Sequence, residues 1–251
     1  MRVLAFDTAT PATTVALADL APPAPPAPAP LPAPAPPPAG STLELRDDPT
    51  PGSRPNHTRR LLELIEEALA RTQTGWSEID RIAVGIGPGT FTGLRIGIAT
   101  AHALARARRL PLVGVSTLAA LALPAADGAP ERDVLAVLDA RRGEAFVAGW
   151  TFGGTPGHHP PALPAAVLAP EALAAAGAQL RPGALAVGDG AVKFARNLKR
   201  SGLIVPPEDS ELHRVTARAH CRLAIDLEPG RLGDVQPEYL RLPDAEISRR
   251  T

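Results

Sequence analysis

Two stretches of the sequence, residues 3–9 and 134–140, share one pattern: an apolar run leads into an aspartate and a small residue. A polar turn and a second apolar run follow each of them, so both stretches predict a β-hairpin. Asp7 stands in the first hairpin and Asp139 in the second. Because each hairpin opens one half of the chain, the pattern favours an internal duplication over a chance similarity of two strands. The sequence therefore predicts an α/β protein of two related lobes.

The length and composition of the chain suit two lobes. Of its 251 residues, 45% are apolar and 21% are charged, which is ordinary usage for a chain with packed cores. We expect the first lobe at residues 1–115 and the second at residues 116–215, with a C-terminal helix and tail, about 216–251, returning to the first lobe. Residues 21–39 are almost entirely alanine and proline. Such a segment has few backbone donors and favours extended backbone, so it predicts an exposed insertion in the first lobe.

Hydrophobic periodicity and turn residues predict the remaining elements. In the first half they predict a returning strand at 41–46, helices at 56–72 and 92–109, and strands at 79–86 and 112–115. In the second half they predict strands at 145–150, 185–187 and near 203–205, helices at 170–176, 192–200 and 216–227, and a loop at 156–164. The unit between residues 79 and 115 is a strand, a helix and a strand, so its two strands are expected to pair in parallel.

Charge and cysteine content exclude several classes of protein. The 26 basic and 26 acidic residues cancel, so no field of the whole molecule draws the chain to nucleic acid or to an anionic membrane. Cys221 is the only cysteine, which excludes a disulfide within the chain and every zinc module that needs several cysteines. No apolar stretch approaches the roughly 20 residues that span a bilayer. We therefore expect a soluble, cytoplasmic protein.

Two helices have unusual faces. In the predicted helix 92–109, small residues recur at every fourth position, which gives one side almost no bulk: Gly93, Gly97, Ala101 and Ala105. A helix of another subunit could approach closely there, and we favour this interpretation over packing on the protein's own sheet. In the predicted helix 56–72, the apolar residues cover a broad arc: Leu61, Leu62, Leu64, Ile65, Ala68 and Leu69. Burial against two surfaces and deep burial against one both explain that arc.

The glycine-rich segment 85–95 lacks the spacing of a phosphate-binding P-loop and of a dinucleotide-binding loop, so it predicts a tight turn before a helix. The hairpin residues Asp7, Thr8 and Thr10 have the groups to hold a phosphate or a hydrated magnesium ion, although an aspartate that closes a β-turn is the simpler alternative. The histidines include no pair four residues apart, so a helical zinc pair is absent from the sequence.

The sequence resembles the bacterial TsaB family, also called YeaZ. The resemblance is carried by residues 4–10 (LAFDTAT), 56–58 (NHT), 61–65 (LLELI), 87–97 (GPGTFTGLRIG), 139–144 (DARRGE), 188–190 (GDG) and 237–241 (PEYLR). It implies an actin-like ATPase fold (ASKHA, ribonuclease H-like) with two related lobes and mixed sheets flanked by helices. It also implies a non-catalytic subunit that supports TsaD. That complex transfers a threonylcarbamoyl group to the adenosine following the anticodon of tRNA, and TsaE joins it as an ATPase partner.

The resemblance also implies where the functional residues lie. The dimer surface of the family is formed by the first two helices, which here carry Leu61, Leu62, Ile65, Leu69, Gly93, Gly97, Ala101 and Ala105. A vestigial nucleotide site would comprise Asp7, Thr8, Thr10, Gly188 and Gly190. Active members of the superfamily carry glycine where this chain has Ala9, and the partner's paired metal histidines have no counterpart, because Leu61 stands four residues after His57.

These departures predict no catalytic residue, no metal ion and no cofactor, and they leave weak binding of ATP or ADP open. Contact with tRNA is expected through the complex, because the chain lacks the basic stripe with stacking aromatics of a free-standing RNA-binding module. Self-association of the chain alone also stays open. The alternative function is that of a small ATP-dependent kinase or a metallopeptidase-like enzyme of the same fold, although the groups that either needs are not found in the sequence.

Overall fold

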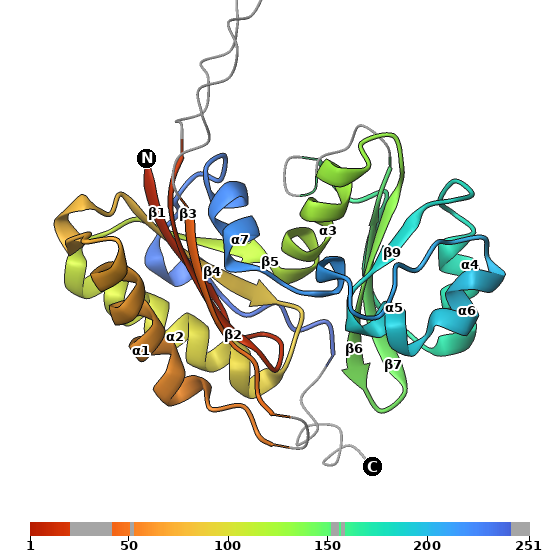
Figure 1. Ribbon diagram of the computed structural model, residues 1–251, viewed down its shortest axis with the longest axis horizontal. Coiled ribbons are helices and arrows are strands. Elements are labelled where there is room, and N and C mark those ends of the chain that lie inside the picture. The colour runs from red at the N-terminus through yellow and green to blue at the C-terminus, as the bar shows by residue number, and fades with distance from the viewer. Residues whose placement is uncertain (21–41, 51–52, 152–155, 157–158, 242–251) are drawn as a thin grey trace, which may run out of the picture.

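The computed structural model of the protein (Figure 1) describes residues 1–20, 42–50, 53–151, 156 and 159–241. The insertion predicted at residues 21–39 lies outside the described residues. Two β-sheets stand apart, each with helices on its faces, and two further helices lie between them. The predicted α/β fold of two lobes is thereby confirmed. The predicted boundaries at residues 115 and 215 stay a prediction.

The first sheet has five strands in the order β3-β2-β1-β4-β5. β1 (Arg2–Asp7), β2 (Thr13–Asp19) and β3 (Thr42–Asp47) are antiparallel neighbours, whereas β4 (Arg81–Gly87) is parallel to β1 and to β5 (Leu112–Ser116). α1 (His57–Arg71) and α2 (Phe91–Arg108) cover one face, and α7 (Ala217–Ala224) packs on the other (Figure 1). Because both faces are covered, β1 is buried almost throughout, which explains its continuous apolar run.

The second sheet has four strands in the order β8-β7-β6-β9. β6 (Val134–Arg141), β7 (Glu144–Trp150) and β8 (Leu163–Leu168) are antiparallel neighbours, and β9 (Leu185–Val187) is parallel to β6. α4 (Pro170–Gly177) contacts β8, and α5 (Asp189–Lys193) contacts β6. α6 (Ala195–Arg200) packs on α4. Its strand order repeats β3-β2-β1-β4 of the first sheet. Ile204 forms a parallel bridge to Leu185 at the place that β5 has in the first lobe.

The core between the two sheets is built around α3 (Thr117–Gly128) and α7, which Figure 1 shows between the lobes. One cluster of buried apolar residues includes Val3 and Ala5 of the first sheet, Leu121 of α3, and Val134 and Ala136 of the second sheet. The lobes therefore share a hydrophobic core. Three short 3₁₀ helices complete the described elements: η1 (Trp76–Glu78), η2 (Glu211–His213) and η3 (Leu232–Asp234).

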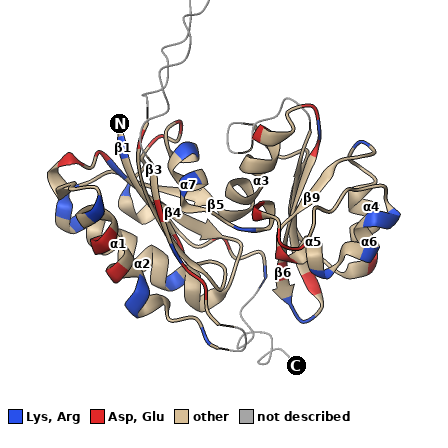
Figure 2. Ribbon diagram, in the orientation of Figure 1, with Lys and Arg blue, Asp and Glu red and all other residues tan. Residues whose placement is uncertain are grey.

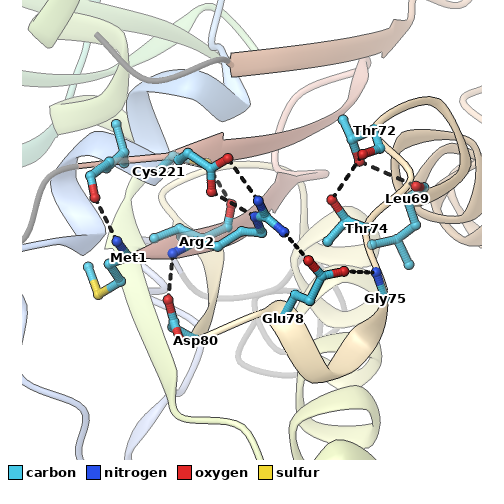
Figure 3. Close-up of polar contacts among 12 residues, drawn as sticks. Met1, Arg2, Leu69, Thr72, Thr74, Gly75, Glu78, Asp80 and Cys221 are labelled. Atoms are coloured by element: carbon cyan, nitrogen blue, oxygen red, sulfur yellow. Dashed lines mark hydrogen bonds and ion pairs between the residues drawn. The ribbon is translucent and has the colours of Figure 1, made fainter. Parts of the chain in front are cut away.

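Polar contacts of Arg2 hold the first residues of β1 against its neighbours in the first sheet (Figure 3). The Arg2 guanidinium pairs with Asp19 at 2.7 Å and with Glu78 at 2.9 Å, and the Arg2 backbone N–H donates to Asp80 at 2.6 Å. Glu78 also accepts from the Gly75 backbone N–H at 2.7 Å. These bonds tie β1 to β2 and to the segment that leads into β4.

The sequence-based assignment of elements was wrong at four places. It missed α3, which is apolar on nearly all sides and so lacks an amphipathic period, and it missed β8, part of which was assigned to a loop. The single helix predicted at 192–200 is two short helices that meet at Phe194. The strand predicted near 203–205 is reduced to the bridge at Ile204.

Candidate functional site

Asp7 lies at the end of β1, and its carboxylate is enclosed by groups of the chain itself. The residue is only 1% exposed. Its Oδ1 accepts a hydrogen bond from the backbone N–H of Ala9 at 2.8 Å, and its Oδ2 accepts one from the Thr117 hydroxyl at 3.1 Å. Oδ2 also lies 3.1 Å from Nε2 of His220, a fully buried residue of α7. The carboxylate is therefore held from the turn that follows β1, from α3 and from α7.

The hydrogen bonding of His220 sets its protonation. Its Nδ1 is 2.9 Å from the carbonyl oxygen of Thr216, which only accepts, so Nδ1 carries a proton. Nε2 faces the Asp7 carboxylate, although the contact is not aligned as a hydrogen bond. Burial alone would lower the pKa of His220, but the attraction of Asp7 outweighs it and raises that pKa above its ordinary value. Burial alone would raise the pKa of Asp7, but His220 outweighs it and lowers that pKa. The two groups form a buried ion pair.

Gly85 of β4 makes room for this pair. A Cβ atom at position 85 would lie 1.7 Å from Oδ2 of Asp7 and 3.1 Å from Nε2 of His220. No side chain fits there without displacing the carboxylate. The neighbouring hairpin residue, Thr8, is buried and donates its hydroxyl to the carbonyl oxygen of Gly93 at 2.7 Å. Asp7 and Thr8, which the sequence assigned to a vestigial nucleotide site, therefore bond the protein's own chain.

The glycines of the 188–190 turn have a packing role as well. Gly188 has φ +109°, and a Cβ there would lie 2.1 Å from the carbonyl oxygen of Val137. A Cβ at Gly190 would lie 2.7 Å from the carbonyl carbon of Leu138. Both glycines therefore let α5 approach β6 closely. Between them, Asp189 accepts a hydrogen bond from the Asp139 backbone N–H at 3.0 Å.

Five residues were proposed for the nucleotide site. Of these, only Thr10 lines the hollows found in the crevice between the lobes. The larger of two hollows there has a volume of about 300 Å³, and Thr10 and Asp189 line both. The arginines that line the hollows have acidic neighbours within the chain: Arg46 pairs with Asp48, Arg214 with Glu211 and Arg141 with Asp139. Among the described residues that line the crevice, each arginine is thus paired with an acidic side chain, and this pairing competes with the binding of a phosphate.

His57, at the first position of α1, is buried, and its Nδ1 lies 2.8 Å from the hydroxyl of Thr13. Burial lowers the pKa of His57, which favours the neutral ring. Leu61, one turn further along α1, is buried in the first lobe. Among the described residues, no group of three histidine, cysteine, aspartate or glutamate side chains is arranged to hold a metal ion.

The predicted partner interface stays a prediction, and most of its residues lie inside the first lobe. Seven of its eight residues are buried within the first lobe: Leu61, Ile65, Leu69, Gly93, Gly97, Ala101 and Ala105. A Cβ at Gly93 would lie 1.9 Å from the carbonyl oxygen of Thr8, and one at Gly97 would lie 2.5 Å from the Thr8 hydroxyl. The small residues of α2 therefore let the helix approach the protein's own hairpin, which favours the alternative of packing within the chain. Of the predicted set, only Leu62 is exposed, at 48%.

A second row of small residues, which is not part of the predicted interface, runs along the exposed side of α2: Ala99, Ala103 and Ala107. On α1, which contacts α2 on the same face of the sheet (Figure 1), the exposed row is Leu62, Glu66 and Ala70. We call these six residues the outer helix face. Their four-residue spacing was visible in the sequence, but the row containing the glycines carried the stronger signal.

Charges of both signs are spread over both lobes (Figure 2). Within the described part of the chain, no helix is both long enough and apolar enough to cross a membrane.

Comparisons with known proteins point to one group. A family model described as "TsaD: tRNA N6-adenosine threonylcarbamoyltransferase" matches residues 51–213. The tRNA threonylcarbamoyladenosine biosynthesis protein TsaB of Escherichia coli K12 is 36% identical over 148 residues, which is 59% of this chain and 54% of that protein. The TsaB protein of Haemophilus influenzae is 40% identical over 90 residues, 36% of this chain and 38% of that protein. The match thus spans about half, or less, of the length of these relatives.

Two solved structures match over nearly their whole length. A Pseudomonas aeruginosa protein described as similar to peptidase YEAZ has a TM-score of 0.72 and 28% identity, covering 96% of this chain and 99% of that chain. A structure described as YeaZ from Pseudomonas aeruginosa has a TM-score of 0.69 and 27% identity, with coverage of 95% and 99%.

Proposed function

The chain belongs to the TsaB (YeaZ) family and has its actin-like ATPase fold, and we propose that it takes part in the biosynthesis of threonylcarbamoyladenosine in tRNA. We infer further that it acts as a non-catalytic subunit, which binds and supports a TsaD-type partner that transfers the threonylcarbamoyl group. On the same family grounds, we infer that TsaE joins the assembly and that the chain contacts tRNA as part of the complex. A cytoplasmic location goes with this proposal, because the substrate is tRNA.

The state of Asp7 is the observation that carries the non-catalytic role. A carboxylate that orients a hydrated magnesium ion must reach solvent and keep oxygen lone pairs free for it. Asp7 is 1% exposed and is held by Ala9, Thr117 and His220. This arrangement supports a structural role for the hairpin, and it argues against the alternative function as a small kinase.

The outer helix face supports the binding of a partner. The matched region of the TsaD family model, residues 51–213, includes α1 and α2. A TsaD-type partner would therefore present a related pair of helices, and two such pairs can pack together about an approximate twofold axis. The alanines on the exposed side of α2 permit close approach, and Leu62 supplies an apolar anchor at 48% exposure. The same face would serve a homodimer of the chain alone.

Isothermal titration calorimetry with a purified TsaD homologue tests this proposal. Leu62→Asp places a charge in the proposed interface and is expected to weaken binding by about tenfold or more, which corresponds to about 1.4 kcal/mol or more. Ile204→Asp is the matched control, because Ile204 is a large apolar residue of the second lobe at 43% exposure. It should leave the affinity unchanged. Equal effects of the two substitutions, or no binding by the wild-type chain, would contradict the proposed interface.

A further inference from the structure

The C-terminal segment 235–241 runs from the first lobe to the second, and we call it the strap. It follows η3 and makes polar and apolar contacts with α2 and β4, and then with the β6–β7 hairpin. These contacts join α2, which carries part of the outer helix face, to the second lobe. Their interpretation rests on the proposed function.

The strap is fixed first to the body of the first lobe. Val235 is 7% exposed, and its carbonyl oxygen lies 2.9 Å from Nε2 of His102 on α2. The backbone N–H of Glu238 donates to the carbonyl oxygen of Ile86 at 2.7 Å, which ties the strap to the end of β4. Gly87, with φ +115°, allows this approach, because a Cβ there would lie 2.9 Å from the carbonyl oxygen of Glu238.

Tyr239 then packs on the first turns of α2. Its ring centroid is 5.3 Å from that of Phe91, and its hydroxyl accepts a hydrogen bond from Nε of Arg95 at 3.1 Å. The Arg95 guanidinium lies 3.8 Å from the Phe91 ring centroid, so the three side chains form one stack. Tyr239 remains 40% exposed. Because α2 carries half of the outer helix face, this stack places the strap within reach of a partner that is seated on that face.

Two residues further along, the strap joins the second lobe. Leu240 packs against the core cluster that the two lobes share. Arg241 donates to the carbonyl oxygen of Ala140 at 3.2 Å and pairs with Glu144 at 2.9 Å. Ala140 and Glu144 belong to the β6–β7 hairpin, whose Arg141 lines the crevice between the lobes. In extended chain, residues two apart are separated by about 7 Å, with little slack. A displacement of Tyr239 is therefore carried to the second hairpin.

We propose that the strap couples partner binding on the outer helix face to the angle between the two lobes. A TsaD-type partner that contacts Tyr239 and Arg95 moves the strap, and Arg241 passes the movement to the β6–β7 hairpin and so to the crevice. The coupling is reciprocal by thermodynamic necessity: whatever fixes the lobe angle changes the affinity for the partner by the same factor. Outside Val235, the strap residues are exposed or only partly buried, which suits an element that can shift while the shared core stays intact.

Distance measurements between spin labels test the coupling. Ser77→Cys in the first lobe and Lys199→Cys in the second provide exposed attachment points outside the outer helix face and the strap. The native Cys221 is buried, and burial raises the pKa of its thiol, so it stays unlabelled in the folded chain. We expect a purified TsaD homologue to shift the distance distribution of the labelled wild-type chain. Arg241→Ala should broaden the distribution without partner, abolish the shift and weaken binding by about fivefold or less, as expected for loss of a partly exposed ion pair.

Arg196→Ala is the matched control, because Arg196 is an exposed arginine of the second lobe outside the strap. It should leave both distributions unchanged. Thermal unfolding of Arg241→Ala should remain cooperative and close to that of the wild type, which excludes loss of the fold as the cause. If the partner binds but the wild-type distribution does not shift, or the shift survives in Arg241→Ala, the coupling is refuted and the proposed function stands. If the wild-type chain does not bind the partner, the proposed function fails, and the coupling fails with it.

Discussion

Substitution of His220 by alanine tests the buried ion pair, because it leaves the Asp7 carboxylate without its charged neighbour. Asp7 is 1% exposed and His220 is fully buried, so bulk solvent does not reach the carboxylate in the wild type. Removal of one partner of a buried pair typically costs about 3–5 kcal/mol. At roughly 2–4 °C per kcal/mol for a chain of this size, the melting temperature should fall by roughly 6–20 °C.

The loss should depend on pH in a defined way. The folded-state pKa of Asp7 lies below its ordinary value of 3.8, so its contribution is complete above that value and is lost as the pH falls through the folded-state pKa. The folded-state pKa of His220 lies above 6.5, so its contribution is complete below that value and is lost as the pH rises through the folded-state pKa. The melting temperatures of wild type and His220→Ala should therefore differ most between pH 3.8 and 6.5.

Calorimetric melting of the isolated chain across this pH range is the assay, with Asp7→Asn to complete a double-mutant cycle. In the Asp7→Asn background, His220→Ala should cost much less than in the wild type, because no buried charge is left unpaired. The reasoning is refuted if His220→Ala melts within about 2 °C of the wild type at pH 6, or if its cost is the same with and without the Asp7 carboxylate.

Three further predictions follow from the two sides of α2, from the insertion and from the hairpin. Ala101→Leu, on the buried side, should cost about 1–3 kcal/mol of folding stability. Ala103→Leu, on the exposed side, should change the melting temperature little and weaken TsaD binding. Thermal melting and titration calorimetry would show the reverse pattern if the two sides of α2 were misassigned. Deletion of residues 22–38 should leave cooperative unfolding and the melting temperature unchanged, because residues 20–21 and 39–41 suffice to join the antiparallel strands β2 and β3; a loss of several degrees would show otherwise. The isolated chain should hydrolyse no ATP above background in a phosphate-release assay, and turnover that Asp7→Asn abolishes would contradict the non-catalytic role.

The sequence by itself determined the features that depend on neighbouring residues. Each hairpin aspartate accepts a hydrogen bond from the backbone N–H two residues on, Asp7 from Ala9 at 2.8 Å and Asp139 from Arg141 at 2.9 Å. This turn is a local preference of aspartate, so the repeated pattern could be recognised without a structure. The same holds for the periodicity of α1 and α2 and for the motifs that carry the family resemblance.

Only the tertiary structure decided which surfaces meet. Small residues on α2 show how closely something can approach, but they do not say what approaches, and rows of small residues lie on both its buried and its exposed sides. α3 gave no periodic signal, because helices and strands of both lobes surround it. His220 and Asp7 lie at opposite ends of the chain, so their ion pair forms only when α7 packs on β1. Contacts between distant segments depend on the whole fold, and the sequence of one segment does not contain them.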